Sequence, residues 1–353
     1  MLFAKVKTHE KYIKRCIQLA KNGLGTTYSN PLVGCVIVHN DSIIGEGWHY
    51  QSGKPHAEVN AIASVKDHSL LKDATIYVSL EPCSHFGKTP PCSNLIIEKG
   101  IKKVVIGTID TFAKVSGAGI QKLMNAGCDV IVGVLENECL ALNKRFFTFH
   151  NKKRPYIILK WAETADGYIA PVTTNKRKPI WITNTYSRQI VHKWRAEEQA
   201  ILVGSQTVIK DNPKLTIRDW AGQHHPTRIV INRSGKIPKD SAVLDQSVKT
   251  IIITSEKFKQ KNSDTLIYEV IDTQENLAKE ICNILYKHNI QSVIIEGGSY
   301  TIQSFIDKNL WDEARVFEGN TTFGTGIKSP LLKGNLISEQ KIMTDTLKTY
   351  QND

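Results

Sequence analysis

Apolar positions along the chain repeat in two spacings, one typical of helices and one typical of strands. Between Tyr12 and Ala20 they fall three or four residues apart, as on a helix with one buried face, and Thr8 is the expected N-cap. Two β-rich runs follow at residues 32–38 and 42–46, separated by turn-forming residues. The first part of the chain therefore predicts an amphipathic helix packed on a sheet that begins with a hairpin.

The alternation of strands and helices continues to residue 149. We expect strands at residues 74–80, 103–107 and 129–132, and helices at residues 56–66, from 92 onward, at 119–125 and at 136–149. This order is typical of a mixed sheet with helices on both faces. A basic polar stretch at residues 150–154 then interrupts the pattern. We place the domain boundary there, which gives a first domain of residues 1–149.

A second α/β pattern occupies residues 150–353. Strands are expected at residues 155–161, 200–204, 228–231, 250–254 and 292–295, and helices at residues 185–195 and after Gly298. The strand at 292–295 runs into Gly297-Gly298, so free backbone amides and the positive end of the next helix would face a pyrophosphate. No G-x-G-x-x-G fingerprint occurs in this half, so an ordinary Rossmann domain is not supported. The predicted fold class is α/β, with two three-layer α/β/α domains.

Composition fits two soluble globular domains. A chain of 353 residues is too long for one ordinary core, and 41% hydrophobic with 23% charged residues is typical of soluble proteins. The longest apolar runs stay far short of the roughly 18 residues that a membrane span needs. The N-terminus lacks the features of a secretory signal, and the seven cysteines are odd in number and lie mostly in apolar segments. We therefore expect a cytoplasmic protein with reduced thiols.

The formal net charge of +12 has two possible explanations. Lys and Arg are scattered, with the densest clusters at residues 152–154 and 176–178, and neither cluster forms a long polybasic tail. A solvated basic surface is the simplest explanation, and binding of phosphorylated ligands is the next.

One His, one Glu and two Cys form a pattern that suits a catalytic zinc. His56 and Glu58 are two residues apart, and Cys83 and Cys92 each follow a proline. The imidazole and the thiolates would supply three tetrahedral ligands, and a water would take the open fourth position. Residues two apart on a helix point in different directions, so Glu58 fits beside that water, as the general acid/base of zinc deaminases. The predicted reaction is hydrolytic removal of an exocyclic amine from a nucleobase-like ring.

Two plainer explanations of this pattern need to be weighed. A His-x-Glu triplet alone arises by chance in many proteins, but two Pro-Cys pairs at this distance downstream argue against chance. His85 is a possible fourth ligand, which would close a structural Cys2His2 site. That arrangement would leave Glu58 without a purpose and would crowd His85 against Cys83.

Four stretches of the first half carry a family resemblance, at residues 30–36, 45–49, 56–59 and 81–92. Together they are similar to the deaminase half of the bifunctional deaminase/reductases of riboflavin biosynthesis. Transfer RNA adenosine deaminases and cytidine deaminases share the fold and the His-Ala-Glu, but they usually close the metal site with Pro-Cys-x-x-Cys. Eight residues separate the two Cys here. This longer loop, which contains Gly-Lys-Thr, resembles the riboflavin branch, whose substrate carries a ribose phosphate.

The resemblance implies a cytidine-deaminase-like fold and a set of substrate contacts. The implied substrate residues are Asn30 and His49 at the pyrimidine or ribose, and His85, Lys88 and Thr89 at the phosphate. The chemistry agrees, because Lys is a point-charge partner for phosphate and a Thr hydroxyl adds a hydrogen-bond donor. Residues 110–113 depart from the Pro-rich turn that relatives tend to carry, which puts the conformation of that loop in doubt.

Motifs across the second half carry a matching resemblance. They lie at residues 160–162, 166–167, 181–183, 191–196, 201–208, 211–218 and 296–298. Together they are similar to the reductase half of the same family, so the resemblance covers nearly the whole chain with both halves in the expected order. It implies a dihydrofolate-reductase-like fold that uses NADPH.

The reductase resemblance also assigns residues position by position. The implied cofactor residues are Ala162, Trp181, Thr207, Asp211, Gly298, Ser299, Tyr300, Thr301, Ile302, Gln303 and Ser304. The implied substrate residues are Arg195, Leu215, Arg218 and Glu296, with Pro179 where the family often has a substrate-binding Ser. The two Arg suit a phosphate because their donors form a planar fork. A longer basic loop at residues 175–178 is a candidate for a different substrate contact.

The implied second reaction is hydride transfer from NADPH to the sugar carbon, which opens the ribose to a ribityl chain. Lys160 and Asp211 are both candidates for the accompanying proton. The expected protein is therefore a bifunctional enzyme of riboflavin biosynthesis. It would deaminate 2,5-diamino-6-(5-phosphoribosylamino)pyrimidin-4-one with zinc and then reduce its ribosyl group with NADPH, in domains of residues 1–149 and 150–353. We expect a homo-oligomer that binds this small phosphorylated substrate and neither nucleic acid nor membrane.

Two alternatives from other functional classes stay open. A nucleic-acid adenosine or cytidine deaminase with a C-terminal binding module would suit the basic charge, but the sequence has no basic-aromatic stripe or long arm. A non-catalytic scaffold stabilised by zinc would have a closed metal site and no role for Glu58.

Overall fold

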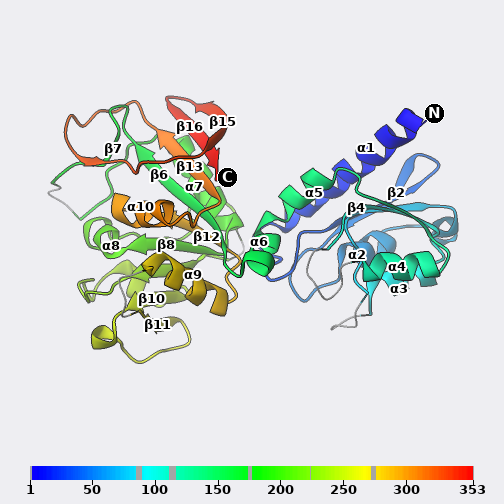
Figure 1. The fold of residues 1–353 in the computed structure, drawn as a ribbon, viewed down its shortest axis with the longest axis horizontal. Helices are drawn as coiled ribbons and strands as arrows, with labels where there is room; N and C mark the ends of the chain where they lie inside the picture. The colour runs from blue at the N-terminus through cyan, green and yellow to red at the C-terminus, as the bar shows by residue number, and fades with distance from the viewer. Residues whose placement is uncertain are drawn as a thin grey trace. The chain divides into compact units, whose positions relative to one another are not determined.

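The structure is a computed structural model that describes residues 2–84, 90–110, 117–173, 177–222, 224–271 and 276–352. The chain forms two compact units, Met1–Lys152 and Lys153–Asp353 (Figure 1). The division falls within the basic stretch at residues 150–154. Among the residues described, no helix combines the length and the apolar character that crossing a membrane requires.

The first unit is built on a five-stranded sheet with the order β2-β1-β3-β4-β5. β1 pairs antiparallel with both β2 and β3, whereas β3, β4 and β5 are parallel. Its strands are β1 (Gly34–His39), β2 (Ser42–Trp48), β3 (Thr75–Leu80), β4 (Lys103–Thr108) and β5 (Asp129–Val132). Its helices are α1 (Leu2–Ala20), α2 (Ala57–Ala63), α3 (Cys92–Glu98), α4 (Ala118–Asn125), α5 (Glu136–Leu142) and α6 (Lys144–Lys152), with short 3-10 helices at Lys21–Gly23 and His68–Lys72.

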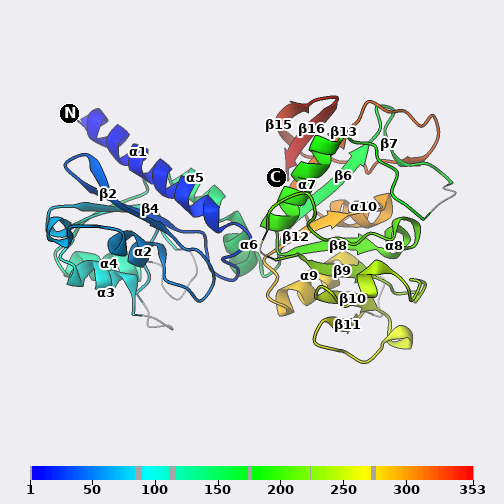
Figure 2. The ribbon, with the colours of Figure 1, turned by 180° about the vertical axis from the view of Figure 1, so that it is seen from behind.

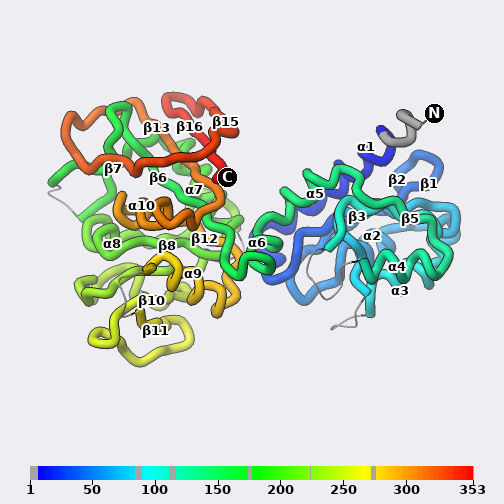
Figure 3. The backbone as a smooth tube through the Cα atoms, in the orientation of Figure 1, coloured from blue at the N-terminus to red at the C-terminus, as the bar shows by residue number. Residues whose placement is uncertain are grey.

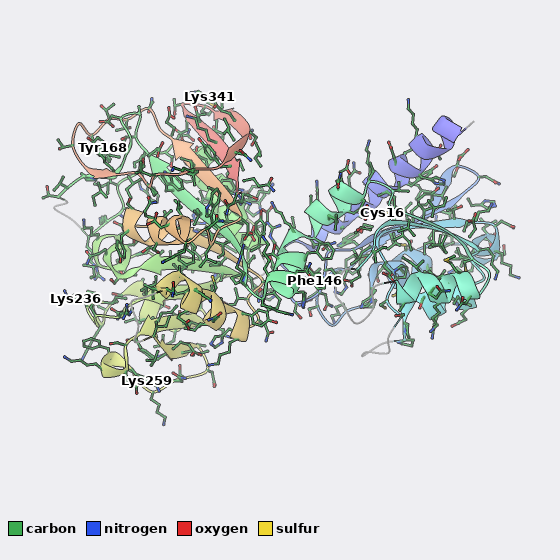
Figure 4. The ribbon with its side chains drawn as sticks, viewed as in Figure 1. Cys16, Phe146, Tyr168, Lys236, Lys259 and Lys341 are labelled. Carbon is green, nitrogen blue, oxygen red and sulfur yellow. The ribbon has the colours of Figure 1, made fainter. Side chains whose placement is uncertain are left out.

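Alternate side chains of each buried strand face opposite layers of helices. Cys35 and Ile37 of β1 pack in the layer that α2, α3 and α4 cover, while Val36 and Val38 pack against α1 and α5. The two layers are visible above and below the sheet in Figure 1 and from behind in Figure 2. Cys16 marks the contact of α1 with the sheet in Figure 4, where its thiol donates to the carbonyl of Tyr77 at 3.3 Å. This is the expected mixed sheet with helices on both faces.

Two predictions about helix ends in this unit are wrong. α1 begins at Leu2, so Thr8 lies inside the helix and does not cap it. The single helix expected at residues 136–149 is broken at Asn143 into α5 and α6. The Asn143 side chain accepts from Leu32 N at 2.8 Å and donates to Leu32 O at 2.9 Å, so a tertiary contact sets the break.

The second unit contains a nine-stranded sheet with the order β11-β10-β9-β8-β12-β6-β13-β16-β15. Its strands run parallel from β11 to β13, and β16 and β15 add an antiparallel edge. Its strands are β6 (Tyr156–Glu163), β8 (Ala200–Gly204), β9 (Thr227–Ile231), β10 (Thr250–Thr254), β11 (Leu266–Val270), β12 (Ser292–Glu296), β13 (Glu313–Glu318), β15 (Asn335–Ile342) and β16 (Asp345–Gln351); β7 (Tyr168–Ala170) pairs separately with β14 (Ile327–Lys328). Its helices are α7 (Thr185–Glu197), α8 (Ser205–Asp211), α9 (Leu277–Lys287) and α10 (Ser299–Asp307), with 3-10 helices at Ala242–Leu244 and Glu256–Phe258.

Helices cover both faces of this sheet as well. α9 and α10 pack Ile281 and Phe305 against one face, and α7 packs Trp194 against the other. Because β8, β12, β6 and β13 are parallel neighbours, their carboxyl ends meet at one edge. The backbone of this unit can be followed in Figure 3. The segments that follow these ends carry most of the residues implied for the reductase.

Candidate active sites

Three side chains of the first unit meet at the ends of three different elements. His56 is the N-cap of α2, Cys83 lies just past the end of β3, and Cys92 is the first residue of α3. The Nδ1 atom of His56 lies 3.6 Å from Cys83 Sγ and 3.3 Å from Cys92 Sγ. Within the described part of the chain these three residues are a group that could hold a metal ion.

The spacing of the three donor atoms fits a tetrahedral zinc. Zinc bonds of roughly 2.1 Å to nitrogen and 2.3 Å to sulfur, at the tetrahedral angle, would separate the two donors by about 3.6 Å. The nitrogen-to-sulfur distances of 3.6 and 3.3 Å are within about 0.3 Å of that value. One imidazole and two thiols are also the ligand types that zinc favours over harder cations.

The two thiols are arranged so that one is readily ionised. The Cys92 thiol and the His56 ring, together with the Cys92 backbone N–H at 3.3 Å, hold the pKa of Cys83 well below its ordinary value. A thiolate at Cys83 is the form that binds zinc. The turn that carries it is fixed by a hydrogen bond from Ser93 N to Cys83 O at 3.2 Å.

Glu58 lies in the first turn of α2, the helix that begins after His56, and is only 3% exposed. Burial raises its pKa to about 7, with the nearby Cys83 as a second cause. A carboxyl group with this pKa can accept and return a proton near neutral pH. The helix can lie this close to the sheet because β2 has Gly47 at the contact, where a Cβ would come within 2.4 Å of Ala61 N.

Asn30 and His49 lie beside the metal ligands. The ring centroid of His49 is 5.5 Å from that of His56, and His49 is 3% exposed. His49 Nδ1 lies 3.1 Å from Pro55 O, so this nitrogen carries the ring proton and Nε2 accepts from the Asn30 amide at 3.0 Å. Burial lowers the pKa of His49, which keeps the ring neutral. The residues implied for the phosphate, His85, Lys88 and Thr89, lie outside the described residues.

Glu81 has an organising role that sequence reasoning missed. Its buried carboxylate accepts backbone hydrogen bonds from Gly117 N at 3.0 Å and Gly119 N at 2.9 Å, and it also contacts the amides of Asp110 and Ile120 at 3.3 Å. It thus ties the start of α4 to the Pro-Cys turn that carries the first thiol ligand. An acidic residue directly before a Pro-Cys pair was the only signal in the sequence.

In the second unit a charged cluster lies at the carboxyl ends of β6 and β12. Arg195 Nη2 of α7 contacts Glu296 Oε2 at 2.8 Å, and both side chains are nearly buried. Lys160 is the Cα partner of Glu296 on the neighbouring strand, so the two side chains share a face of the sheet. Burial alone would raise the pKa of Glu296, but Arg195 and Lys160 outweigh it and lower that pKa. Burial also lowers the pKa of Lys160.

The segment after α8 brings two more implied substrate residues to this cluster. Arg195 Nη1 donates to Thr216 O at 3.4 Å, which places Leu215 and Arg218 next to α7. Leu215 is buried and has a positive φ of 55°. Burial and the charge of Arg195 lower the pKa of Arg218. The four implied substrate residues Arg195, Leu215, Arg218 and Glu296 are therefore brought together from separate parts of the chain.

Of the implied cofactor residues, Thr207 and Gly298 lie together just after Glu296, with one correction to the sequence pattern. Gly298 N donates to Thr207 Oγ1 at 3.2 Å, so this amide is not free as the Gly-Gly pattern predicts. Thr301 lies near Gly204 of β8, whereas Ile302 is fully buried in the core and Gln303 Oε1 accepts from Leu331 N at 2.8 Å. Ser304 Oγ donates to Thr301 O, and the side chain of Tyr300 is exposed.

The other side of the cofactor region is more open. Trp181 is 58% exposed and lies under the Arg188 guanidinium at 4.7 Å, and Pro179 is exposed. Asp211 ends α8, and burial raises its pKa. In the basic loop, Asn175 lies outside the described residues, and Arg177 does not face the substrate residues: it donates to Ser241 Oγ at 2.8 Å and to Ile209 O at 3.1 Å.

Comparison with known proteins identifies both units. A family model of the cytidine and deoxycytidylate deaminase zinc-binding region matches residues 6–108, and one of the RibD C-terminal domain matches residues 155–353. The chain is 41% identical over 325 residues to riboflavin biosynthesis protein RibD of Aquifex aeolicus, which covers 90% of this chain and 88% of that one. The chain belongs to the RibD family.

Solved RibD-type structures cover the whole chain. A deaminase/reductase from Thermotoga maritima is 38% identical with a TM-score of 0.90, over 99% of this chain and 100% of that one. Acinetobacter baumannii RibD is 30% identical with a TM-score of 0.88, over 99% of each chain. The chain is therefore a bifunctional deaminase and reductase of riboflavin biosynthesis that works with zinc and NADPH, and the predicted fold class, activities and cofactors are confirmed. The roles of individual residues stay predictions.

Proposed function

We propose that residues 1–149 deaminate 2,5-diamino-6-(5-phosphoribosylamino)pyrimidin-4-one and that residues 150–353 reduce the ribosyl group of the product to ribityl. The similar protein from T. maritima is named as the corresponding pair of a pyrimidine deaminase and a uracil reductase. The observation that carries the proposal is the buried Glu58 beside the His56, Cys83 and Cys92 donors. A closed structural metal site would have no use for that carboxyl group.

In the deaminase unit, His56, Cys83 and Cys92 would hold the zinc, which supplies Lewis-acid activation of water when bound. Glu58 accepts a proton at a carboxylate oxygen and returns it to the departing exocyclic amine. Its burial supports this role, because no bulk water competes for the proton. Asn30 orients the substrate ring, since His49 Nε2 fixes the direction of its amide.

In the reductase unit, NADPH supplies a hydride to the sugar carbon, and the ring oxygen that is released needs a proton. Of the two candidates, Lys160 is favoured by its position. It shares a sheet face with Glu296 and has a pKa that burial lowers, so its ammonium group gives up a proton more readily. Asp211 ends α8, the helix that also carries Thr207, and we assign it to cofactor binding.

Arg195 and Arg218 would bind the substrate phosphate. Arg195 is paired with Glu296 Oε2, and a ribose hydroxyl can donate to Glu296 Oε1, which has no partner among the described residues. The charge of the site is positive, because Lys160, Arg195 and Arg218 outnumber the carboxylates of Glu296 and Asp219. This field suits a phosphorylated substrate.

We also propose that the protein is a cytoplasmic homo-oligomer without a nucleic-acid partner. The seven cysteines are free thiols, which suits a reducing compartment. β15 lies at the end of the nine-stranded sheet and exposes Leu336 and Ile337, so a second copy is a suitable cover for this edge. Light scattering on the wild type and on Ile337→Lys tests the oligomer, and a gel shift with transfer RNA tests the absence of nucleic-acid binding.

The test of the two activities follows ammonia release and NADPH oxidation separately on purified protein. The diamino substrate should release ammonia without NADPH, and only the deaminated product should support NADPH oxidation. Removing zinc with a chelator should stop ammonia release and leave NADPH oxidation with the deaminated product intact. Ammonia release that survives complete zinc removal would contradict the deaminase assignment.

A further inference from the structure

His192 is a buried titratable residue that neither proposed reaction uses. It lies on α7, one turn before Arg195, and is 4% exposed. Histidines buried in this way need partners for both ring nitrogens. Both of its nitrogens face residues 218 and 219, in the segment that carries the second substrate arginine.

The hydrogen bonds of the ring define its tautomer. Arg218 N donates to His192 Nδ1 at 3.2 Å, so the proton of the neutral ring is on Nε2. Nε2 lies 3.4 Å from Asp219 Oδ2 and 3.3 Å from Arg218 Nη2. The imidazole therefore accepts from the backbone of Arg218, and its Nε2–H faces the Asp219 carboxylate, because the Arg218 guanidinium can only donate.

The hydrogen bond from Arg218 N to His192 holds Arg218 near Arg195, although the two guanidinium groups repel each other. Arg195 and Arg218 carry like charges in a partly buried place, and the charge of Arg195 disfavours the charged form of Arg218. Arg195 donates to the segment at Thr216 O, over a long 3.4 Å. Burial and the two arginines lower the pKa of His192 to about 4, so at neutral pH the ring adds no third positive charge.

We propose that His192 is a positioning residue of the reductase, which fixes the Arg218 backbone so that Arg195 and Arg218 meet one substrate phosphate. The inference rests on the proposed function, in which these two arginines bind the phosphate. Because the Arg218 backbone is already held by His192, the Arg218 side chain can bind the phosphate without the entropic cost of first ordering residues 215–219. The affinity for the phosphate is therefore prepared before the substrate arrives.

The test compares His192→Phe, which keeps a ring and removes the acceptor, with His192→Asn, whose amide oxygen stands near the position of Nδ1. In His192→Phe we expect the KM for the phosphorylated reductase substrate to rise by about tenfold, the loss that one hydrogen bond of roughly 1.4 kcal/mol produces. We expect kcat and the KM for NADPH to change less than about twofold, because the ring touches no reacting atom. His192→Asn should restore the wild-type KM.

Three controls separate positioning from general damage. The dephosphorylated substrate should have the same KM in the wild type and in His192→Phe. Ammonia release by the other unit should be unchanged in all variants. His225→Phe removes the acceptor of Ile217 N on the same segment but at an exposed residue, so water can replace it and the KM should stay near the wild-type value.

Binding of inorganic phosphate to the full chain, measured by calorimetry, keeps this inference distinct from the proposed function. His192→Phe should weaken phosphate binding, and His192→Asn should not. Equal phosphate affinity in the wild type and His192→Phe, or an equal rise in KM for the dephosphorylated substrate, overturns the positioning role. A wild type that binds phosphate through these arginines but never oxidises NADPH with the substrate overturns the proposed function instead.

Discussion

Replacing Arg195 by Met should destabilise the reductase unit through the charge left behind on Glu296. The Met side chain keeps most of the apolar stem of Arg195 and removes the guanidinium. Arg195 Nη2 lies 2.8 Å from Glu296 Oε2, and the two side chains are 11% and 12% exposed. Glu296 would then keep Lys160 as its remaining positive neighbour on the sheet.

The magnitude follows from the geometry of the pair. Two unit charges about 4 Å apart interact by about 4 kcal/mol at an effective dielectric constant near 20. Part of this is recovered, because the desolvation cost of the guanidinium disappears and Lys160 remains. A net loss of about 3 kcal/mol is the usual cost of removing one partner of a buried pair. For a unit of roughly 200 residues this lowers the melting temperature by about 6 to 12 °C.

Calorimetry of the full chain with and without NADPH measures this effect. NADPH should shift only the transition of the unit that binds it, which identifies the reductase transition. The double variant Arg195→Met with Glu296→Gln should melt higher than Arg195→Met alone, because no buried charge is stranded. If the two single changes simply add in the double variant, the pair carries no coupling and the reasoning is refuted.

The pair also predicts a pH dependence with a definite sign. The pKa of Glu296 is lowered in the folded state, so the pair contributes stability above the ordinary Glu pKa and loses it as the pH falls through the lowered value. The wild-type reductase transition should therefore lose more stability than the Glu296→Gln transition on acidification below the ordinary value. Parallel pH curves for the two proteins would contradict the lowered pKa.

Three further changes test other parts of the chain. Glu58→Gln should keep its zinc, as metal analysis would show, and should lower the rate of ammonia release by about ten-thousandfold, the upper end for an acid/base residue. The loss is large because Glu58 is only 3% exposed, so bulk water cannot replace its carboxyl group. NADPH oxidation with the deaminated product is the control and should not change. Asp245→Asn removes the carboxylate that lies 2.7 Å from the buried Arg228. Burial opposes ionisation of Asp245, but the hydrogen bond with Arg228 outweighs it and lowers the pKa of Asp245 to about 2. The free energy of unfolding should therefore fall by about 1 kcal/mol at pH 7, after allowance for solvent screening, and the difference between wild type and variant in urea unfolding should shrink below pH 3.8. Gly34→Ala would place a Cβ 2.0 Å from Cys16 O, so α1 must move away from β1. The free energy of unfolding of the deaminase unit should fall by about 3 kcal/mol, while the melting temperature of the reductase unit should not change.

The metal site could be predicted from sequence because its parts are local. The three ligands stand at the starts or ends of elements within one short stretch, and Pro and turn residues mark those ends. His56 caps α2 and Cys92 opens α3, as the Pro-before-ligand pattern indicates. Buried strands such as β10 were equally clear, because the centre of Thr250–Thr254 is a run of three Ile and every residue of the strand is buried.

Features that depend on distant contacts were not predictable. The break at Asn143 exists because its side chain pairs with the backbone of Leu32, which no local pattern reveals. β15 exposes its first seven positions, so it lacks the alternation that identifies a strand. Glu81 and His192 each act on backbone amides far along the chain, and the sequence offers no periodic signal for such contacts.

The two sites differ in how their residues are brought together, and only the reductase site depends on the register of two paired strands. The deaminase donors lie in one stretch, whereas Lys160 and Glu296 of the reductase become neighbours only because β6 and β12 pair in register. A slip of one residue in that pairing would turn Glu296 to the opposite face of the sheet, away from Lys160 and Arg195. β12 is buried throughout and β6 is buried over its first four residues, so these apolar runs would fit either face and do not by themselves forbid the slip. We therefore expect the ionic cluster to fix the register, and in the proposed function the same charges also bind the substrate.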